Sequence, residues 1–435
     1  MDKDTLLDIF SAALREADPY DSVVRHCSQV VEEYSKGSYR GIHILAFGKA
    51  AMGMARAAMD HLGDLILDGI AVTKRGDSTE KIEDPRIEIH EAGHPLPDEA
   101  GVYATKRITA LAQDMEERDF ALCLISGGTS ALLVAPYPGI SLQDKQTTTN
   151  LLLKAGADIG AVNTVRKHLS AVKGGRLARM IHPGRVHSLV LSDVIGDRLD
   201  VIGSGPTSPD RTTFADAVEV LSAFDKESQL PDSVRLLLAK GASGSVPETP
   251  KPGDPLFEKV RNTIVAGNGQ AISAALGRAQ ELGFKAHVLA MDIHGEAREA
   301  GAWLAGEVRR ARVRAQREGR ALCLISGGET TVTVKGDGLG GRNLELALAF
   351  ALAIEGEEGI SLLSAGTDGG DGPTDAAGAM VDGTTTSRAR LSGADADIFL
   401  SNNDSYRFFD RVGGLVKTGP TGTNVMDLQI SVVTP

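Results

Sequence analysis

Two copies of one eight-residue segment carry the clearest chemical signal in this sequence. Ala-Leu-Cys-Leu-Ile-Ser-Gly-Gly occupies residues 121–128 and again residues 321–328. The apolar part of each copy predicts a buried strand, and Ser-Gly-Gly predicts a sharp turn at its carboxyl end, where open α/β sheets bind ligands. We therefore expect half of an anion site in each copy, although a plain tight turn is the alternative. The candidate binding residues are Ser126, Gly127, Gly128 and Ser130 in the first copy and Ser326, Gly327, Gly328 and Glu329 in the second.

Two single cations stand at the start of predicted helices. Lys49 follows Gly48 and precedes a helical pattern over residues 50–59, and Arg342 follows a glycine-rich stretch and precedes a helix expected over residues 343–354. A cation is unfavourable at a helix amino terminus, so both positions suggest a bound anion, with Asn343 as a further ligand beside Arg342. The alternatives are an exposed lysine and an arginine paired with a carboxylate.

A basic stretch over residues 163–177 surrounds a Gly-Gly break. Such a cluster suits a carboxylate or a phosphate, but it would also suit a basic helix face in an acidic protein. The candidate binding residues here are Asn163, Arg166, Lys173, Gly174 and Gly175.

Aspartates follow two predicted strands. Asp193 comes directly after the apolar run 188–191, and Asp368 and Asp371 lie in the segment GTDGGDGPTD. Their carboxylates could hold magnesium or accept a proton from a substrate hydroxyl, whereas a turn role is the alternative. The spacing is not that of an EF-hand, so magnesium carried by a nucleotide is the better prediction.

This inventory of cations, glycine turns and acids is what phosphoryl transfer requires. The sequence contains no Walker A loop, no G-x-G-x-x-G after a strand, and no Ser/His/Asp arrangement. A standard nucleotide loop and a covalent nucleophile are therefore not expected.

Strand and helix patterns alternate from about residue 40, which predicts parallel strands with crossover helices. Strands are expected at 42–47, 120–125, 188–191 and 263–266, and a strand-like alternation also occurs at 332–334. Residues 241–256 contain four prolines, which favours a connection between domains. We predict domains at 1–245 and 246–435.

Composition limits the classes of function. A chain of 435 residues predicts two domains, and a net charge of -12 argues against a nucleic-acid partner. The arginines between residues 309 and 320 fit a solvated helix face with local ion pairs. Three scattered cysteines predict buried, reduced thiols, and the charged amino terminus and the lack of a long apolar run predict a cytoplasmic protein with no membrane partner.

Eleven ordered motifs resemble the glycerate kinase family whose carboxyl-terminal part is called the MOFRL domain. The resemblance covers nearly the whole chain and includes AFGKAAMGMA at 46–55, SGGTSALL at 126–133, NTVRKHLSAVKGGRLA at 163–178, SDVIGDRLDVIGSGPTSPD at 192–210, SGGETTVTVKGDGLGGRNLELAL at 326–348, GTDGGDGPTDAAGA at 366–379 and TGPTGTNVMDL at 418–428.

The resemblance implies an α/β protein with an amino-terminal Rossmann-like parallel sheet, a smaller mixed α/β domain containing the MOFRL region at about 320–430, and an active site in the cleft between them. It implies phosphorylation of D-glycerate by ATP and magnesium, generally giving 2-phosphoglycerate. Lys49 matches the family's catalytic lysine and Arg342 its catalytic arginine. Asp193 is the candidate for orienting or deprotonating the glycerate hydroxyl. Thr129, Gly370 and Leu344 depart from the family pattern, and only Leu344 touches a catalytic motif.

Two other functions remain as alternatives. A hydroxypyruvate or tartronate reductase would need the dinucleotide fingerprint, which the sequence lacks. A non-catalytic binding module would have no use for Lys49 and Arg342 together. The sequence leaves open whether the product is 2- or 3-phosphoglycerate, which domain binds adenine, and whether the protein is a monomer or a homo-oligomer.

Overall fold

A computed structural model describes residues 3–76, 81–225 and 229–435 of the chain. The contacts divide these residues into two compact units. One, here called the amino-terminal unit, contains residues 19–192 and 197–265. The other, here called the carboxyl-terminal unit, contains the residues before Pro19, Asp193–Gly196 and residues from Ala266 onward.

A six-stranded sheet forms the centre of the amino-terminal unit, in the order β3-β2-β1-β4-β5-β6. The chain runs outward from β1 to β3 and then returns to the other side of β1 as β4, so the order reverses between β1 and β4. Ligands bind at such a reversal, outside the carboxyl ends of the strands. The strands are β1 (Ile42–Phe47), β2 (Ile66–Lys74), β3 (Ile87–Ala92), β4 (Phe120–Ile125), β5 (Arg185–Leu191) and β6 (Val260–Ala266).

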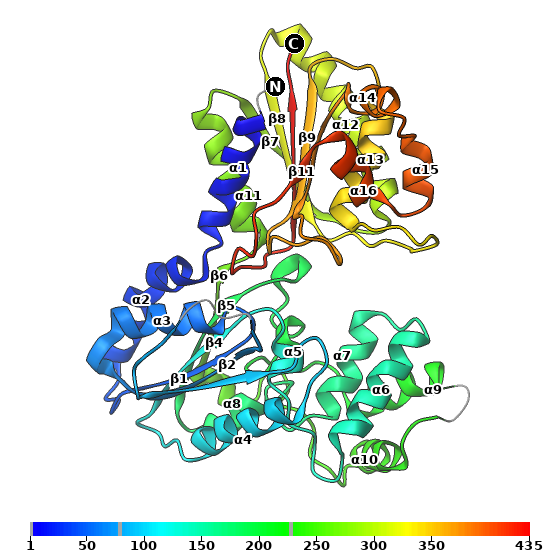
Figure 1. Cartoon of the computed structure of the whole chain (residues 1–435). Coiled ribbons are helices and arrows are strands. Elements are labelled where there is room, and N and C mark those ends of the chain that lie inside the picture. Colours follow the sequence, from blue (N-terminus) through cyan, green and yellow to red (C-terminus); the bar gives the residue numbers. More distant parts are fainter. Residues whose placement is uncertain (1–2, 77–80, 226–228) are drawn as a thin grey trace. The chain divides into compact units, whose positions relative to one another are not determined.

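Helices cover both faces of this sheet (Figure 1). On one face α2 (Pro19–Lys36) packs against α3 (Ala51–Leu62), and on the other α4 (Glu99–Gln113) packs against α8 (Arg176–Ile181). β1 and β4 are buried along their whole length, as expected for central parallel strands between two helix layers. The Rossmann-like parallel sheet with flanking helices is therefore confirmed. Short elements connect these parts: η1 (Gly63–Leu65), α5 (Thr129–Leu132), η2 (Ile195–Asp197), η3 (Ile202–Ser204) and η4 (Pro255–Lys259).

Four helices of the amino-terminal unit pack on one another beside the sheet layers. Their common core includes Leu152, Val165, Phe214 and Leu238. The alternation of strands and helices did not predict this separate helical lobe. Its members are α6 (Leu142–Lys154), α7 (Ile159–His168), α9 (Phe214–Phe224) and α10 (Asp232–Ala242).

The carboxyl-terminal unit contains a mixed sheet in the order β11-β10-β9-β12-β8-β7. Only β7 and β8 pair in parallel, because β12 runs antiparallel to both β8 and β9. This arrangement confirms the second, mixed α/β part of the predicted fold. The strands are β7 (Lys285–Ile293), β8 (Leu322–Gly328), β9 (Ile360–Gly366), β10 (Gly378–Asp382), β11 (Leu415–Val416) and β12 (Asp427–Val433).

One face of this second sheet carries α1 (Lys3–Glu16) and α11 (Asn268–Glu281), which pack against each other (Figure 1). The apolar stripe of α1, which includes Leu6, Ile9 and Phe10, is buried. The other face carries α12 (Ala297–Glu318) and α13 (Arg342–Ala353), with α14 (Thr385–Leu391), α15 (Ala396–Ser401) and α16 (Ser405–Val412) packed around α13.

The compact units differ from the predicted ranges in three places. The change of unit falls between Val265 and Ala266 rather than at 245/246, and both α1 and Asp193–Gly196 belong to the carboxyl-terminal unit. The proline-containing segment is tied to the amino-terminal unit, because Asp210 accepts a hydrogen bond from the Thr249 hydroxyl at 3.0 Å and its amide donates to the Pro250 carbonyl at 2.8 Å. Proline content alone did not indicate this packing.

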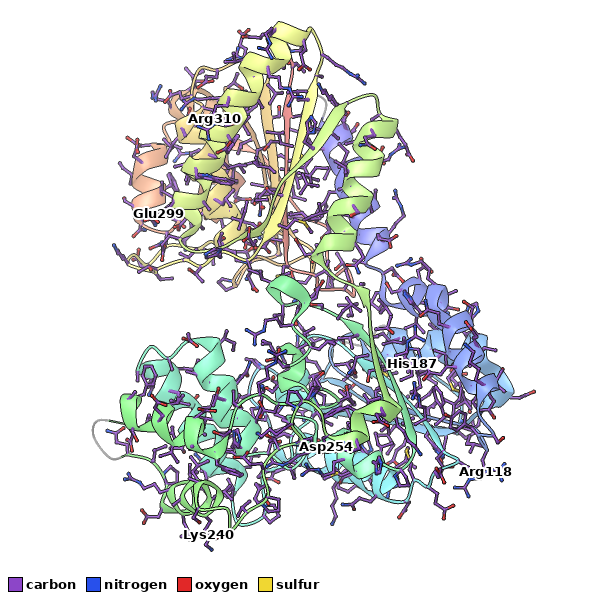
Figure 2. All side chains as sticks on the ribbon, turned by 180° about the vertical axis from the view of Figure 1, so that it is seen from behind. Arg118, His187, Lys240, Asp254, Glu299 and Arg310 are labelled. Carbon is purple, nitrogen blue, oxygen red and sulfur yellow. The ribbon has the colours of Figure 1, made fainter. Side chains whose placement is uncertain are left out.

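Three smaller predictions can be compared with the structure. The arginines of α12 do form a solvated face: Arg310 pairs with Glu307 and points outward in Figure 2, and Arg314 pairs with Glu318 at 2.9 Å. The three cysteines are free and buried. Within the described residues, no helix combines the length and the apolar character that a bilayer crossing requires.

Candidate active site

The turn after β1 and the loop after β4 are bound to each other at the point where the strand order reverses. The Lys49 amide donates to the Gly127 carbonyl at 2.8 Å, and the Ala50 amide donates to the Ser126 hydroxyl at 3.0 Å. Gly48 has a φ of 131°, and a Cβ there would lie 2.2 Å from the Ser126 Oγ, so no other residue fits without displacement. The predicted glycine turn and Lys49 therefore form one structure.

The Lys49 side chain runs along this loop. A Cβ on Gly128, whose φ is 83°, would lie 3.1 Å from the Lys49 Cγ. Lys49 is half-buried, and its ammonium has no carboxylate or hydrogen-bond partner among the residues that the structure describes. A cation held over a glycine loop at this position of the sheet is available to an anionic ligand.

Hydroxyl and amide side chains connect this loop to the basic stretch. The Ser130 hydroxyl lies 3.4 Å from that of Ser204, and the Ser204 hydroxyl donates to the Asn163 Oδ1 at 3.1 Å. Lys173 donates to the Gly203 carbonyl at 3.1 Å, next to Ser204. The structure thus brings Ser130, Asn163 and Lys173 together through Ser204, which the sequence analysis did not select although the surrounding GSGP motif was a signal.

The basic stretch separates into two roles. Lys167 pairs with Asp210 at 3.1 Å, and Arg176 donates to the Lys167 and Ser170 carbonyls at 2.7 and 2.8 Å, so both stabilise the fold. Arg166 and Lys173 have no carboxylate partner within the described chain. The Gly174 and Gly175 amides donate to the Ser204 and Gly205 carbonyls at 3.0 and 2.7 Å. The two glycines therefore dock this stretch onto the Ser204 loop, and their amides are used within the protein.

The second copy of the repeated segment does not form the predicted turn. Ser326, Gly327 and Gly328 continue β8, because β12 pairs with all three residues. Ser326 is buried and donates to the Gln429 side chain at 3.3 Å, and a Cβ on Gly327 would lie 2.0 Å from the Asn268 Oδ1. The expectation of a sharp turn here was wrong, as was the strand at 332–334, where only Thr331 makes a bridge, to Glu296.

Arg342 is the first residue of α13 and is held by two carboxylates. Its Nε and Nη2 donate to the two oxygens of Asp427 at 2.6 and 2.9 Å, and Nη1 lies 3.0 Å from Glu329. Burial opposes the charge of Arg342, but Asp427 and Glu329 raise its pKa, so the guanidinium stays positive. The alternative of an arginine paired with a carboxylate is thus realised, and Asp427, within the VMDL motif, is a functional candidate that the sequence analysis missed.

Glu329 lies in an acidic environment. Loss of hydration raises the pKa of Glu329, and repulsion from Asp427, Asp193 and Asp368 acts in the same direction, while Arg342 opposes the shift. Asp193, although it follows β5 in sequence, is grouped with the carboxyl-terminal unit. Three of the predicted acids therefore contribute to the electrostatics around Arg342.

Asp371 anchors the start of α13. It accepts the Asn343 and Leu344 amides at 3.1 and 2.8 Å, and Asn343 in turn accepts the Ser364 hydroxyl at 2.7 Å. Burial raises the pKa of Asp371 to about 7, although the two amides oppose the shift. A carboxylate with both oxygens engaged by a helix terminus fits a positioning role better than the predicted role of magnesium ligand.

The acids available for magnesium are few. Asp368 accepts the Gly370 amide at 3.1 Å, and no group of three His, Cys, Asp or Glu residues in the described ranges is arranged to hold a metal ion. Magnesium in kinases usually keeps its waters and is held by one or two carboxylates together with the substrate phosphates. The residues present fit magnesium carried by nucleotide phosphates, with Asp193 and Asp368 as the candidates for contact.

Comparisons with known proteins agree with this arrangement of motifs. Residues 5–239 match the family model "Domain of unknown function (DUF4147)", and residues 322–427 match the MOFRL family. The D-glycerate 2-kinase of Thermotoga maritima is 45% identical over 404 residues, which cover 93% of each chain. The glycerate 2-kinase of Pyrococcus horikoshii is 43% identical over 434 residues, covering 98% of this chain and 96% of the relative.

The same relationship holds in three dimensions. The crystal structure of a glycerate kinase from Thermotoga maritima superposes with a TM-score of 0.88 and 42% sequence identity, covering 99% of both chains. The superposed region covers both units and the motifs discussed above. The chain belongs to the glycerate kinase family that carries a MOFRL region.

Proposed function

We propose that this protein transfers the γ-phosphoryl group of ATP to a hydroxyl of D-glycerate and gives 2-phosphoglycerate. The relatives named above carry this activity in their names. The observation in the molecule that carries the proposal is the position of Lys49, whose Cγ lies beside Gly128 of the Ser126–Gly128 loop at the reversal of strand order. A positive charge that has no partner among the described residues at such a point suits a phosphate.

Lys49 contributes electrostatic stabilisation in this proposal. As the bond from the γ-phosphorus to the glycerate oxygen forms and the bond to the β,γ-bridging oxygen breaks, negative charge is spread over the phosphoryl oxygens. A preorganised ammonium stabilises that charge more than it stabilises the ground state. Magnesium, when bound to the nucleotide, neutralises further charge on the β- and γ-phosphates.

Arg342 has the second cationic role. Its bidentate pairing with Asp427 fixes the guanidinium plane, so the remaining N–H groups point in a set direction. We propose that these groups bind phosphoryl oxygens during transfer. Because Arg342→Met alone would leave Asp427 buried without its partner, the appropriate test is Arg342→Met combined with Asp427→Asn.

Asp193 is proposed to act on the acceptor. Its carboxylate would take the proton from the glycerate hydroxyl as the oxygen attacks phosphorus, while the bond to the β,γ-bridging oxygen breaks and ADP leaves with the electron pair of that bond. Asp193→Asn keeps the shape of the side chain and removes the basic oxygen. This variant is expected to lower kcat more than it raises KM for glycerate.

One assay tests the proposal. Purified protein with D-glycerate, ATP and magnesium is expected to release ADP, and phosphorus NMR of the product is expected to show 2-phosphoglycerate. A 3-phosphoglycerate signal would show that the other hydroxyl of glycerate is phosphorylated. Oxidation of NADH with hydroxypyruvate and no release of ADP would establish the reductase instead. If neither NADH oxidation nor ADP release is detected, the non-catalytic binding module is the remaining alternative.

A further inference from the structure

A buried lysine in the helical lobe has no hydrogen-bond partner among the described residues. Lys145 lies on α6, is 5% exposed, and its Nζ makes no hydrogen bond in the described structure. No sequence motif singled it out. Burying an ammonium without an acceptor is costly, so such a group in a folded protein needs an explanation.

The charged groups facing Lys145 are cations as well. Arg166 comes from α7, Arg176 is the first residue of α8, and both repel the Lys145 charge. Lys173, in the loop before α8, is fully buried and is repelled by Lys145 and Arg166. Burial, and then this repulsion, lower the pKa of Lys145 to about 7.

The neighbouring acids are already used by other groups. Asp210 accepts from Lys167 and from the Thr212 and Thr249 hydroxyls. Glu248 accepts the Phe214 amide at 2.8 Å and the Lys251 ammonium at 3.1 Å. Lys145, Arg166 and Lys173, here called the cation triad, therefore have no carboxylate of the described chain to balance them.

An anionic ligand would supply the missing charge. The triad lies close to the loop that contains Ser130, because Lys173 donates to the Gly203 carbonyl and the next residue, Ser204, contacts both Ser130 and Asn163. The glycine loop with Lys49 already provides for phosphate. The other anionic group that the two substrates bring is the carboxylate of the acceptor acid.

We propose that the cation triad binds the carboxylate of D-glycerate and that Lys145 is one of its direct ligands. This assignment rests on the proposed function and extends it to the recognition of the acceptor. Arg166 offers the planar fork that matches a carboxylate, while the two lysines supply compact charge. Acceptors without a carboxylate would leave three cations uncompensated, two of them buried, and would be rejected.

The test compares two lysines of one helix. Lys145→Met removes the buried ammonium at similar size, and Lys154→Met is the matched control because Lys154 lies exposed on the same helix. Calorimetric titration with D-glycerate, without nucleotide, is expected to give a Kd at least about tenfold weaker for Lys145→Met and an unchanged Kd for Lys154→Met. KM for ATP is expected to stay within about twofold in both variants.

Proton uptake gives a second readout. At pH 8 part of the Lys145 population is neutral, so binding of the carboxylate should draw a proton onto the amine. The uptake is measured from the dependence of the binding enthalpy on the ionisation enthalpy of phosphate-free buffers. It should be clear in the wild type and reduced in Lys145→Met.

The outcomes separate the two proposals. If the wild type phosphorylates D-glycerate but Lys145→Met binds it as tightly as Lys154→Met does, the triad assignment is wrong and the kinase proposal stands. If KM for ATP rises instead, the site binds nucleotide phosphate and the assignment is again overturned. If D-glycerate is not phosphorylated but tartronate shows Lys145-dependent binding with proton uptake, the carboxylate site stands without the proposed reaction.

Discussion

At the scale of single residues, the two lysines of the amino-terminal unit to which we assign anionic ligands differ in surroundings. Lys49 is half-buried along a glycine loop, whereas Lys145 is buried among cations. The first remains partly exposed to water until a ligand arrives. The charge of Lys145 destabilises the fold until an anionic ligand compensates it, so binding of the ligand is expected to stabilise the protein.

The role of Lys49 predicts a specific loss of activity. Lys49→Met is expected to lower kcat about a hundredfold or more, equivalent to about 2.7 kcal/mol of transition-state stabilisation. Steady-state kinetics of ADP release measure the effect. Lys240→Met is the control because Lys240 lies at the surface on α10 (Figure 2). Equal rates for both variants would exclude Lys49 from the reaction.

The position of Lys145 predicts an increase in stability on substitution. A lysine whose folded-state pKa is lowered to about 7 destabilises the fold fully below pH 7, and the cost disappears as pH rises toward its unfolded value of 10.5, where the unfolded state no longer binds the extra proton. Lys145→Met should therefore raise the free energy of unfolding, at most by about 5 kcal/mol at pH 6. Denaturant titrations in phosphate-free buffers should show a smaller gain in the free energy of unfolding at pH 10 than at pH 6.

Local sequence could predict neither that Lys145 is buried without an acceptor among the described residues nor that Arg342 pairs with Asp427. Both depend on which side chains distant parts of the chain bring nearby. The positions of Lys49 and Ser126–Gly128 could be predicted, because strand ends and glycines specify them locally. The sequence predicts Asp371 as a magnesium ligand but not its hydrogen bonds to α13, because these depend on a contact from residue 371 back to residues 343 and 344.

At the scale of elements, one eight-residue segment adopts two structures. Residues 121–125 form strand in the first copy and the chain then turns, with Gly128 at a φ of 83°. In the second copy β8 continues through Gly328, because Gly327 pairs with Leu428 of β12. The strand itself could be predicted from the apolar run, but its end depends on a partner strand about 100 residues away.

The anchoring of α13 predicts a measurable loss of stability. Asp371→Ala leaves two buried amides without acceptors and is expected to lower the free energy of unfolding by about 2 to 4 kcal/mol. Asp395→Ala is the matched control, since Asp395 accepts the Asp397 and Ile398 amides at the exposed start of α15 and should cost about 1 kcal/mol. Equal losses in urea titrations would show that burial of the anchor has no effect.

At the scale of the whole molecule, the amino-terminal helix is part of the carboxyl-terminal unit. Phe10 is 1% exposed, within the packing of α1 against α11. Sequence alone predicted the amphipathic helix but not its partner, because an apolar stripe does not specify what covers it. Whether residues 1–245 and 246–435 fold independently of each other remains a prediction.

This packing can be tested with a natural probe. The chain has one tryptophan, Trp303, on α12 of the carboxyl-terminal unit. Phe10→Ala is expected to destabilise that unit by about 3 to 5 kcal/mol and to lower the Tm followed by Trp303 fluorescence. Lys3→Ala, an exposed change on the same helix, should leave it unchanged. An unshifted Tm in Phe10→Ala would show that α1 is dispensable to the unit.

The helices α1 and α11 can pair only late in synthesis, because they are far apart in the sequence. α1 ends at Glu16 and α11 begins at Asn268, so about 250 residues are translated between them. At roughly 5 to 20 residues per second, the ribosome needs about 10 to 50 s to deliver the partner. During that interval the apolar stripe of the first helix is exposed to the cellular milieu, which makes the nascent chain a client for chaperones that bind apolar segments.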